Sequence, residues 1–72
     1  MNIKLIKKIP EDIILDDIDN HLVNMLANEC TIKQLAKSLM DNYKLNIEEA
    51  LDKVNLLAYK LNALGLIKGY TE

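Results

Sequence analysis

Several residue types that carry specific chemistry are absent or nearly absent from this 72-residue chain. It has no arginine, tryptophan or phenylalanine, and it has a single cysteine and a single histidine. Cys30 has no second cysteine to pair with, so no intramolecular disulfide can form, whereas a secreted domain of this size usually carries several. Together with an N-terminus that lacks the apolar run of a signal peptide, this predicts a cytoplasmic protein.

The charge balance argues against nucleic acid and membrane as partners. All nine basic residues are lysine and the net charge is −2, whereas duplex binding normally needs a cationic face with arginine reading base edges or clamping phosphates. No stretch approaches the ~20 apolar residues of a membrane span. We therefore expect no membrane partner and regard nucleic acid as disfavoured.

The inventory of reactive side chains predicts a protein that is not an enzyme. His21 is expected on the exposed side of a polar helix face, and no known motif ties a second base or a nucleophile to it. The only glycines, Gly65 and Gly69, form no phosphate-binding loop. We expect no catalytic residue and no cofactor.

A metal site is not expected either. Cys30 and His21 are too few to complete a zinc site. Asp16, Asp17 and Asp19 lack the glycine turn and the distal glutamate of a calcium loop, and helix capping explains them better. The acidic cluster therefore predicts the start of a helix.

The residues that are present favour one small domain spanning 1–72. Half of them are hydrophobic and 28% are charged, which is typical of a globular chain with an aliphatic core. From Asn2 to Leu15 the pattern suits strands: Ile3 and Leu5 alternate with polar neighbours, 9–12 reads as a turn around Pro10, and 13–15 is a β-rich run. We expect a short β-hairpin over 2–15.

Three helices are predicted after that hairpin, near residues 17–28, 31–43 and 47–64. Asp16 or Asp17 caps the first, and Thr31 with Gln34 forms a capping box for the second. The third runs from the cap Asn46 to Gly65. The predicted fold class is α+β, mostly α: a short N-terminal hairpin followed by a winged-helix-like bundle of three helices.

The third helix has two apolar faces. The broad stripe is core and includes Leu61. A second patch on the back of the helix contains Leu56, Tyr59 and Ala63, flanked by Lys53 and Lys60. It is either where the hairpin packs or a groove wall that receives a partner, and the two interpretations are compatible.

These features together resemble the PqqD-like family, the recognition elements (RiPP recognition elements) of pathways that modify ribosomally made peptides. The resemblance spans roughly residues 13 to 67. It rests on four features. A strand ending in Leu-Asp corresponds to 13–17, and the helix after it runs up to Leu26. A second helix that starts with Thr corresponds to 31–36, and a long third helix ending Leu-x-x-x-Gly-Leu-Ile corresponds to 54–57 and 61–67. Only about a dozen residues precede Ile13, so we expect an abbreviated sheet or one completed by another chain.

The resemblance implies a peptide chaperone of natural product biosynthesis. Family members bind the leader segment of a precursor peptide as an extra strand, resting against the third helix. The implied partners are a precursor peptide and a modifying enzyme such as a radical SAM enzyme or a peptidase. The implied peptide-binding residues are those of the last strand and of the back of the helix: Ile13, Ile14, Leu15, Lys53, Leu56, Tyr59, Lys60 and Ala63.

Two other functions remain open at this point. A winged-helix transcriptional regulator would place the third helix in the major groove, although that helix starts with Glu48 and Glu49. A scaffold protein would form homodimers through the patch around Leu56 and Tyr59.

Overall fold

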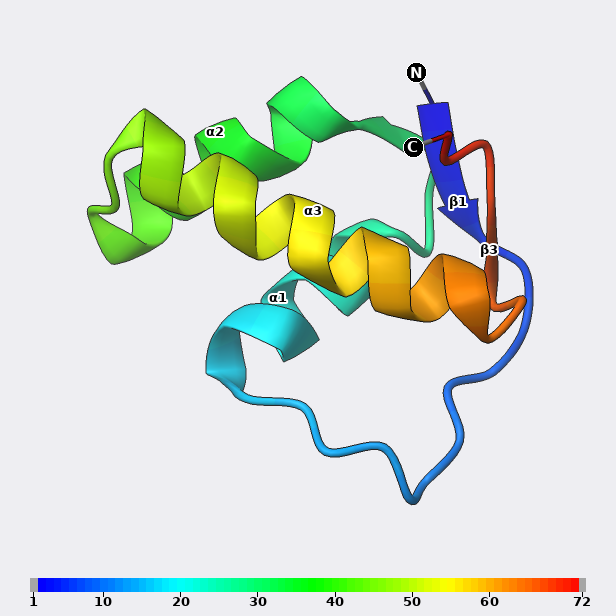
Figure 1. Cartoon of the computed structure of the whole chain (residues 1–72). Coiled ribbons are helices and arrows are strands. Elements are labelled where there is room, and N and C mark those ends of the chain that lie inside the picture. Colours follow the sequence, from blue (N-terminus) through cyan, green and yellow to red (C-terminus); the bar gives the residue numbers. More distant parts are fainter. Residues whose placement is uncertain (1, 72) are drawn as a thin grey trace.

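The computed structural model describes residues 2–71 of the chain, arranged as three helices beside a small antiparallel sheet (Figure 1). The elements follow in the order β1 (Asn2–Leu5), α1 (Asp17–Met25), β2 (Cys30–Thr31), α2 (Ile32–Tyr43), α3 (Ile47–Ala63) and β3 (Ile67–Lys68). The predicted class, α+β and mostly α, is confirmed. No helix within residues 2–71 is long and apolar enough to cross a membrane.

The strands of the sheet come from other segments of the chain than the predicted hairpin. Its strand order is β2-β1-β3, with Ile3 opposite Cys30 and Leu5 opposite Ile67. The predicted hairpin over 2–15 and the predicted strand at 13–15 are therefore wrong, and only Asn2–Leu5 of that region is a strand. β1 is the central strand and both of its edges are paired, so it cannot form a hairpin with 13–15.

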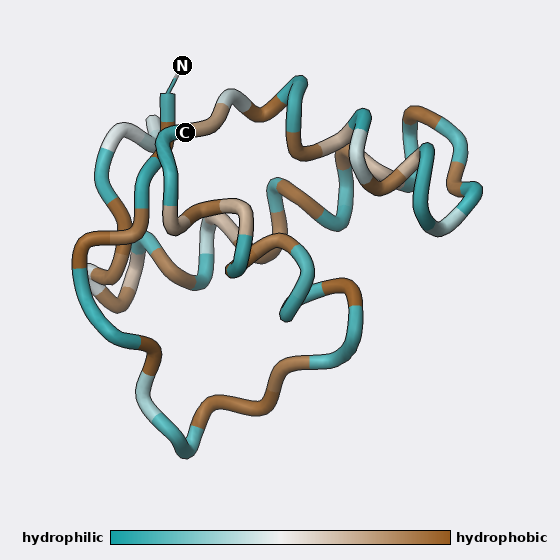
Figure 2. Tube along the Cα trace, turned by 180° about the vertical axis from the view of Figure 1, so that it is seen from behind, coloured by the Kyte–Doolittle hydropathy of each residue, from teal (hydrophilic) through white to brown (hydrophobic). Residues whose placement is uncertain are grey.

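The residues between β1 and α1, 6–16, form a wide loop that extends beyond the end of α3 (Figure 1). Figure 2 shows hydrophobic residues recurring along it. A peptide bond without a strand partner must stay near water, because a buried unpaired backbone group is costly. The loop therefore keeps an exposed path even where its side chains are apolar.

The helix caps are those that the sequence predicts. Each helix begins with a capping box, in which Asp16, Thr31 and Asn46 accept the backbone N–H three residues on, over 2.7, 3.0 and 2.8 Å. Gly65 ends α3 with φ +73°, the left-handed conformation that favours glycine.

The bounds of the helices differ from the predicted ones by at most three residues. The largest difference is at α1, which ends at Met25 rather than residue 28. The carbonyl of Leu26 accepts the N–H of Leu5 at 2.9 Å, so the chain leaves the helix there to reach β1.

The core lies among the three helices and the strands β1 and β3. It is entirely aliphatic, and no polar or charged residue is buried within residues 2–71. Leu61 is 1% exposed, as predicted, and Leu66 and Ile67 fold back onto the end of α3, where both are buried. The buried residues are Ile3, Leu22, Leu26, Leu35, Ala36, Leu39, Ala50, Val54, Leu57, Ala58, Leu61, Leu66 and Ile67.

Candidate functional site

A hollow of about 310 Å³ lies between the 6–16 loop and the C-terminal half of α3, and we call it the α3 hollow. Five of the eight residues predicted to bind a peptide line it. Its lining is apolar apart from the lysine at its rim: Ile13, Leu15, Leu57, Tyr59, Lys60, Leu61, Ala63 and Leu64.

The other three predicted residues lie outside the α3 hollow. Lys53 and Leu56 line a neighbouring hollow of about 300 Å³ together with the acidic residues Glu49 and Asp52. Ile14 points away from the protein and is 91% exposed. Of the eight predicted residues, five therefore line the α3 hollow, two line the neighbouring hollow and one faces away from both.

The α3 side of the hollow owes its shape to helical spacing. Leu57 and Leu61, one turn apart, are buried and form its floor. Tyr59, 52% exposed, and Leu64, 57% exposed, stand at the sides. Such half-exposed apolar side chains around a buried floor leave a large area that a ligand can cover.

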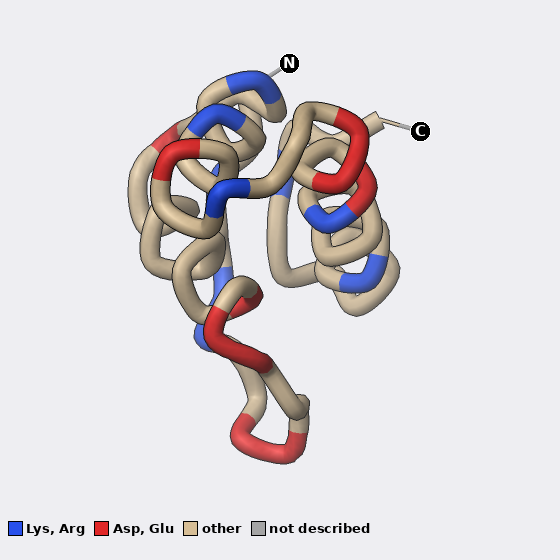
Figure 3. Tube along the Cα trace, turned by 90° about the vertical axis from the view of Figure 1, so that its left-hand side faces the viewer, with Lys and Arg blue, Asp and Glu red and all other residues tan. Residues whose placement is uncertain are grey.

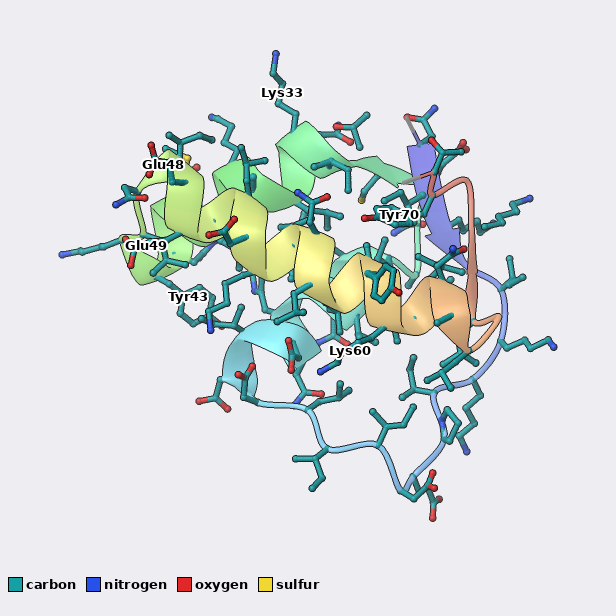
Figure 4. The ribbon with its side chains drawn as sticks, viewed as in Figure 1. Lys33, Tyr43, Glu48, Glu49, Lys60 and Tyr70 are labelled. Atoms are coloured by element: carbon teal, nitrogen blue, oxygen red, sulfur yellow. The ribbon has the colours of Figure 1, made fainter. Side chains whose placement is uncertain are left out.

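Lys60 is the single charged residue of the lining. Figure 4 shows it extending from α3 toward the space bounded by the 6–16 loop. Within residues 2–71 the one ion pair is Lys37–Asp41, at 3.9 Å, so no acidic side chain of the described chain neutralises Lys60. The rim therefore presents a cation beside an apolar surface.

The opposite wall carries unpaired backbone groups. The N–H of Ile13 donates to the carbonyl of Pro10 at 3.2 Å, which closes a turn. Within residues 2–71 the backbone N–H and C=O groups of Ile14 and Leu15 make no hydrogen bond. Ile13 and Leu15 are half-buried while Ile14 and Asp16 are exposed, the alternation of an extended strand with one face against a support.

A polar cluster apart from the α3 hollow joins α1 to α2, and the sequence did not predict it. His21 was expected on an exposed face, but it is half-buried. Its Nε2 lies 2.6 Å from the Oγ of Ser38, and that Oγ accepts a hydrogen bond from the side-chain amide of Asn42 at 3.3 Å. The ring packs edge-on against Tyr43, with centroids 5.5 Å apart. The prediction failed because the crossing of two helices brings His21 and Ser38 together.

This cluster links α1 to α2 through the hydrogen bond between His21 and Ser38. A catalytic Ser–His pair needs a third group that orients the imidazole. Within residues 2–71 the other ring nitrogen of His21 makes no hydrogen bond. The same residues contain no group of three histidine, cysteine, aspartate or glutamate side chains that could hold a metal ion.

Another hollow, of about 630 Å³, lies between the starts of α2 and α3. It is lined by Thr31, Ile32, Lys33, Ala36, Ile47 and Leu51. The capping boxes of Thr31 and Asn46 use local donors, and the lining includes no aromatic side chain. The α3 hollow is the better candidate because it combines an exposed aromatic ring, a cation and unpaired backbone.

Comparison of the chain with models of protein families, with curated proteins and with solved structures gives no significant match. Function is therefore inferred from the geometry of the α3 hollow and from the chemistry of its residues.

Proposed function

We propose that the protein is a non-catalytic peptide-binding module that captures the leader segment of a ribosomally made precursor by strand addition. It would then present the peptide to a modifying enzyme, as the resemblance to the PqqD-like family implies. The observation that carries the proposal is the unpaired backbone of Ile14 and Leu15 beside the apolar α3 hollow. β1 cannot supply the missing partner of 13–15, because it already has a neighbour on each side.

Strand addition would use both walls of the hollow. The backbone of an incoming strand would exchange hydrogen bonds with Ile14 and Leu15. Ile13 and Leu15 turn inward, so alternate side chains of the peptide would enter the hollow next to them and contact Tyr59. Hydrogen bonds supply the pairing, and the hollow fixes which peptide residues face α3.

Lys60 adds a weaker preference. Its side chain is exposed, and an exposed ion pair contributes little to affinity, although it raises the association rate. An inward-facing acidic residue of the peptide near the rim would be favoured on this ground. Lys53 has a smaller role in the proposal, because it lines the neighbouring hollow with Glu49 and Asp52.

The proposal is tested by titrating fluorescent peptides copied from short reading frames adjacent to this gene. Ala63→Gln adds a long neutral side chain to the wall of the α3 hollow and should weaken binding at least about tenfold. Asn55→Gln is the matched control, since Asn55 is exposed on the same helix and lines none of the four hollows described for residues 2–71.

Specific binding that Ala63→Gln reduces and Asn55→Gln leaves unchanged would support the proposed site. Equal affinities of the two variants would place the peptide elsewhere. If none of the peptides binds at micromolar protein, the proposal fails for those candidate precursors.

A further inference from the structure

The segment 11–17 has a symmetric charge pattern that the proposed strand addition does not use. Its sequence is Glu-Asp-Ile-Ile-Leu-Asp-Asp, three apolar residues with an acidic pair on each side. The four acidic residues are exposed. Figure 3 shows the two acidic groups separated by the uncharged stretch of the loop. Any strand that pairs with 13–15 must therefore place its own ends against carboxylates.

These carboxylates are not neutralised within the protein. None of the four takes part in an ion pair in the described part of the chain, where Lys37–Asp41 is the one pair present. Asp16 is partly engaged, because its Oδ1 accepts the N–H of Asp19 at 2.7 Å. That bond caps α1 and brings no cation to the carboxylate. The cations closest along the chain, Lys7 and Lys8, lie on the other side of Pro10.

The pattern disfavours a second copy of the chain as the paired strand. In an antiparallel pairing of 13–15 with itself, the Glu11–Asp12 pair of one copy comes near the Asp16–Asp17 pair of the other copy at each end. A parallel pair in register sets each acid opposite itself. Like charges directly opposite each other destabilise a pair of strands.

We infer that the strand captured at 13–15 has an apolar centre with lysine or arginine on both sides. This inference rests on the proposed function and names the class of peptide. Glu11 and Asp12 lie in the turn that precedes the extended stretch, and Asp16 and Asp17 begin α1 directly after it. In an antiparallel pairing centred on Ile14, the residues on each side of the apolar centre of the ligand therefore come near one acidic pair. Opposite charges at those positions stabilise the pairing. Lys60 acts on the α3 side of the hollow and so influences only the side chains that point inward.

The inference is tested with three labelled synthetic heptapeptides. Each has the apolar centre Val-Ile-Val, and the two residues on each side are lysine, glutamine or glutamate. Fluorescence anisotropy with the full chain in low-salt buffer should give tightest binding for the lysine peptide, with about a three- to tenfold difference from the glutamine peptide. The difference should shrink in high salt, because exposed charges are screened.

Matched variants separate a local effect from attraction by net charge. Glu11→Gln with Asp12→Asn removes two charges from the segment and should remove much of the preference. Glu29→Gln with Glu48→Gln removes two exposed charges elsewhere and should preserve it. Asp16→Asn removes one further charge and keeps a side chain that caps helices well.

The outcomes distinguish the inference from the proposed function. Equal affinity for the three peptides, or tighter binding of the glutamate peptide, would overturn the inferred ligand class and leave peptide binding at the hollow standing. An equal loss of preference in both double variants would reduce the effect to net charge and would also overturn it. Binding that Ala63→Gln does not weaken would refute the proposed function, and the inference with it.

Discussion

Replacement of Tyr59 by alanine best distinguishes a binding role of the α3 hollow from a structural one. A fully buried aromatic side chain covers about 150–250 Å², and Tyr59 is 52% exposed, so a ligand can cover roughly 100 Å² of it. At about 25 cal/mol per Å² this contact is worth ~2.5 kcal/mol. Ordering of the peptide offsets part of that. We expect Tyr59→Ala to weaken binding by about 1–2 kcal/mol, or roughly five- to thirtyfold.

The same substitution should have a small effect on stability. Tyr59 is not among the side chains packed against the core cluster, and alanine is the better helix former by about half a kcal/mol. A net loss below about 1 kcal/mol corresponds to a few degrees in melting temperature.

The assay pairs an anisotropy titration of the peptide with a thermal melt of each variant. Tyr59→Phe, which keeps the ring, should bind nearly as well as the parent protein. Leu56→Ala should weaken binding less than Tyr59→Ala, because Leu56 lines the neighbouring hollow. Unchanged affinity together with a strongly lowered melting temperature would refute the reasoning and show that Tyr59 merely holds the 6–16 loop.

Three further predictions concern the fold and the partner class. Leu61→Ala removes a side chain that is 1% exposed and should cost about 2–5 kcal/mol in urea unfolding; a loss below about half a kcal/mol would contradict the assigned core. Gly69→Ala should lower stability by at least about 1 kcal/mol, because Gly69 has φ +89° and a Cβ there would lie 1.9 Å from the Asn2 carbonyl oxygen. If the melting curves of the variant and of the parent protein coincide, the close approach of Gly69 to β1 is contradicted. A mobility shift with duplex DNA at nanomolar protein and physiological salt should show no sequence-selective complex, and a selective one would revive the winged-helix regulator.

The helices could be predicted because their signals are local. Thr31 with Gln34 and Asn46 with Glu49 are three residues apart, and the stripe through Leu61 follows one helical period. Their bounds and caps therefore follow from the sequence with little knowledge of the rest of the chain. The end of α1 was the least accurate, since it is set by the bond from Leu5 to Leu26.

The sheet could not be predicted because its partners are distant and short. β2 is Cys30–Thr31 and β3 is Ile67–Lys68, and two residues show no alternation. The run at 13–15 has strong β propensity, yet tertiary context overrides propensity. Of the predicted second face and its flanking lysines, Tyr59, Lys60 and Ala63 line the α3 hollow. Leu56 does not, because the path of the loop decides which residues of α3 lie near Ile13 and Leu15.

The loop also supplies a direct test of strand addition by amide hydrogen exchange. Ile14 and Leu15 make no backbone hydrogen bond in the described chain, so in the free protein their amides should exchange at nearly unprotected rates. The amide of buried Leu61, inside α3, should exchange only on extensive unfolding.

A peptide that adds as a strand must take up backbone groups of 13–15, so at least one of these amides should slow markedly at saturating peptide. A peptide held only by side chains in the α3 hollow would still depend on Tyr59 but would leave both amides fast. That result would retain the binding site and reject strand addition as its mode.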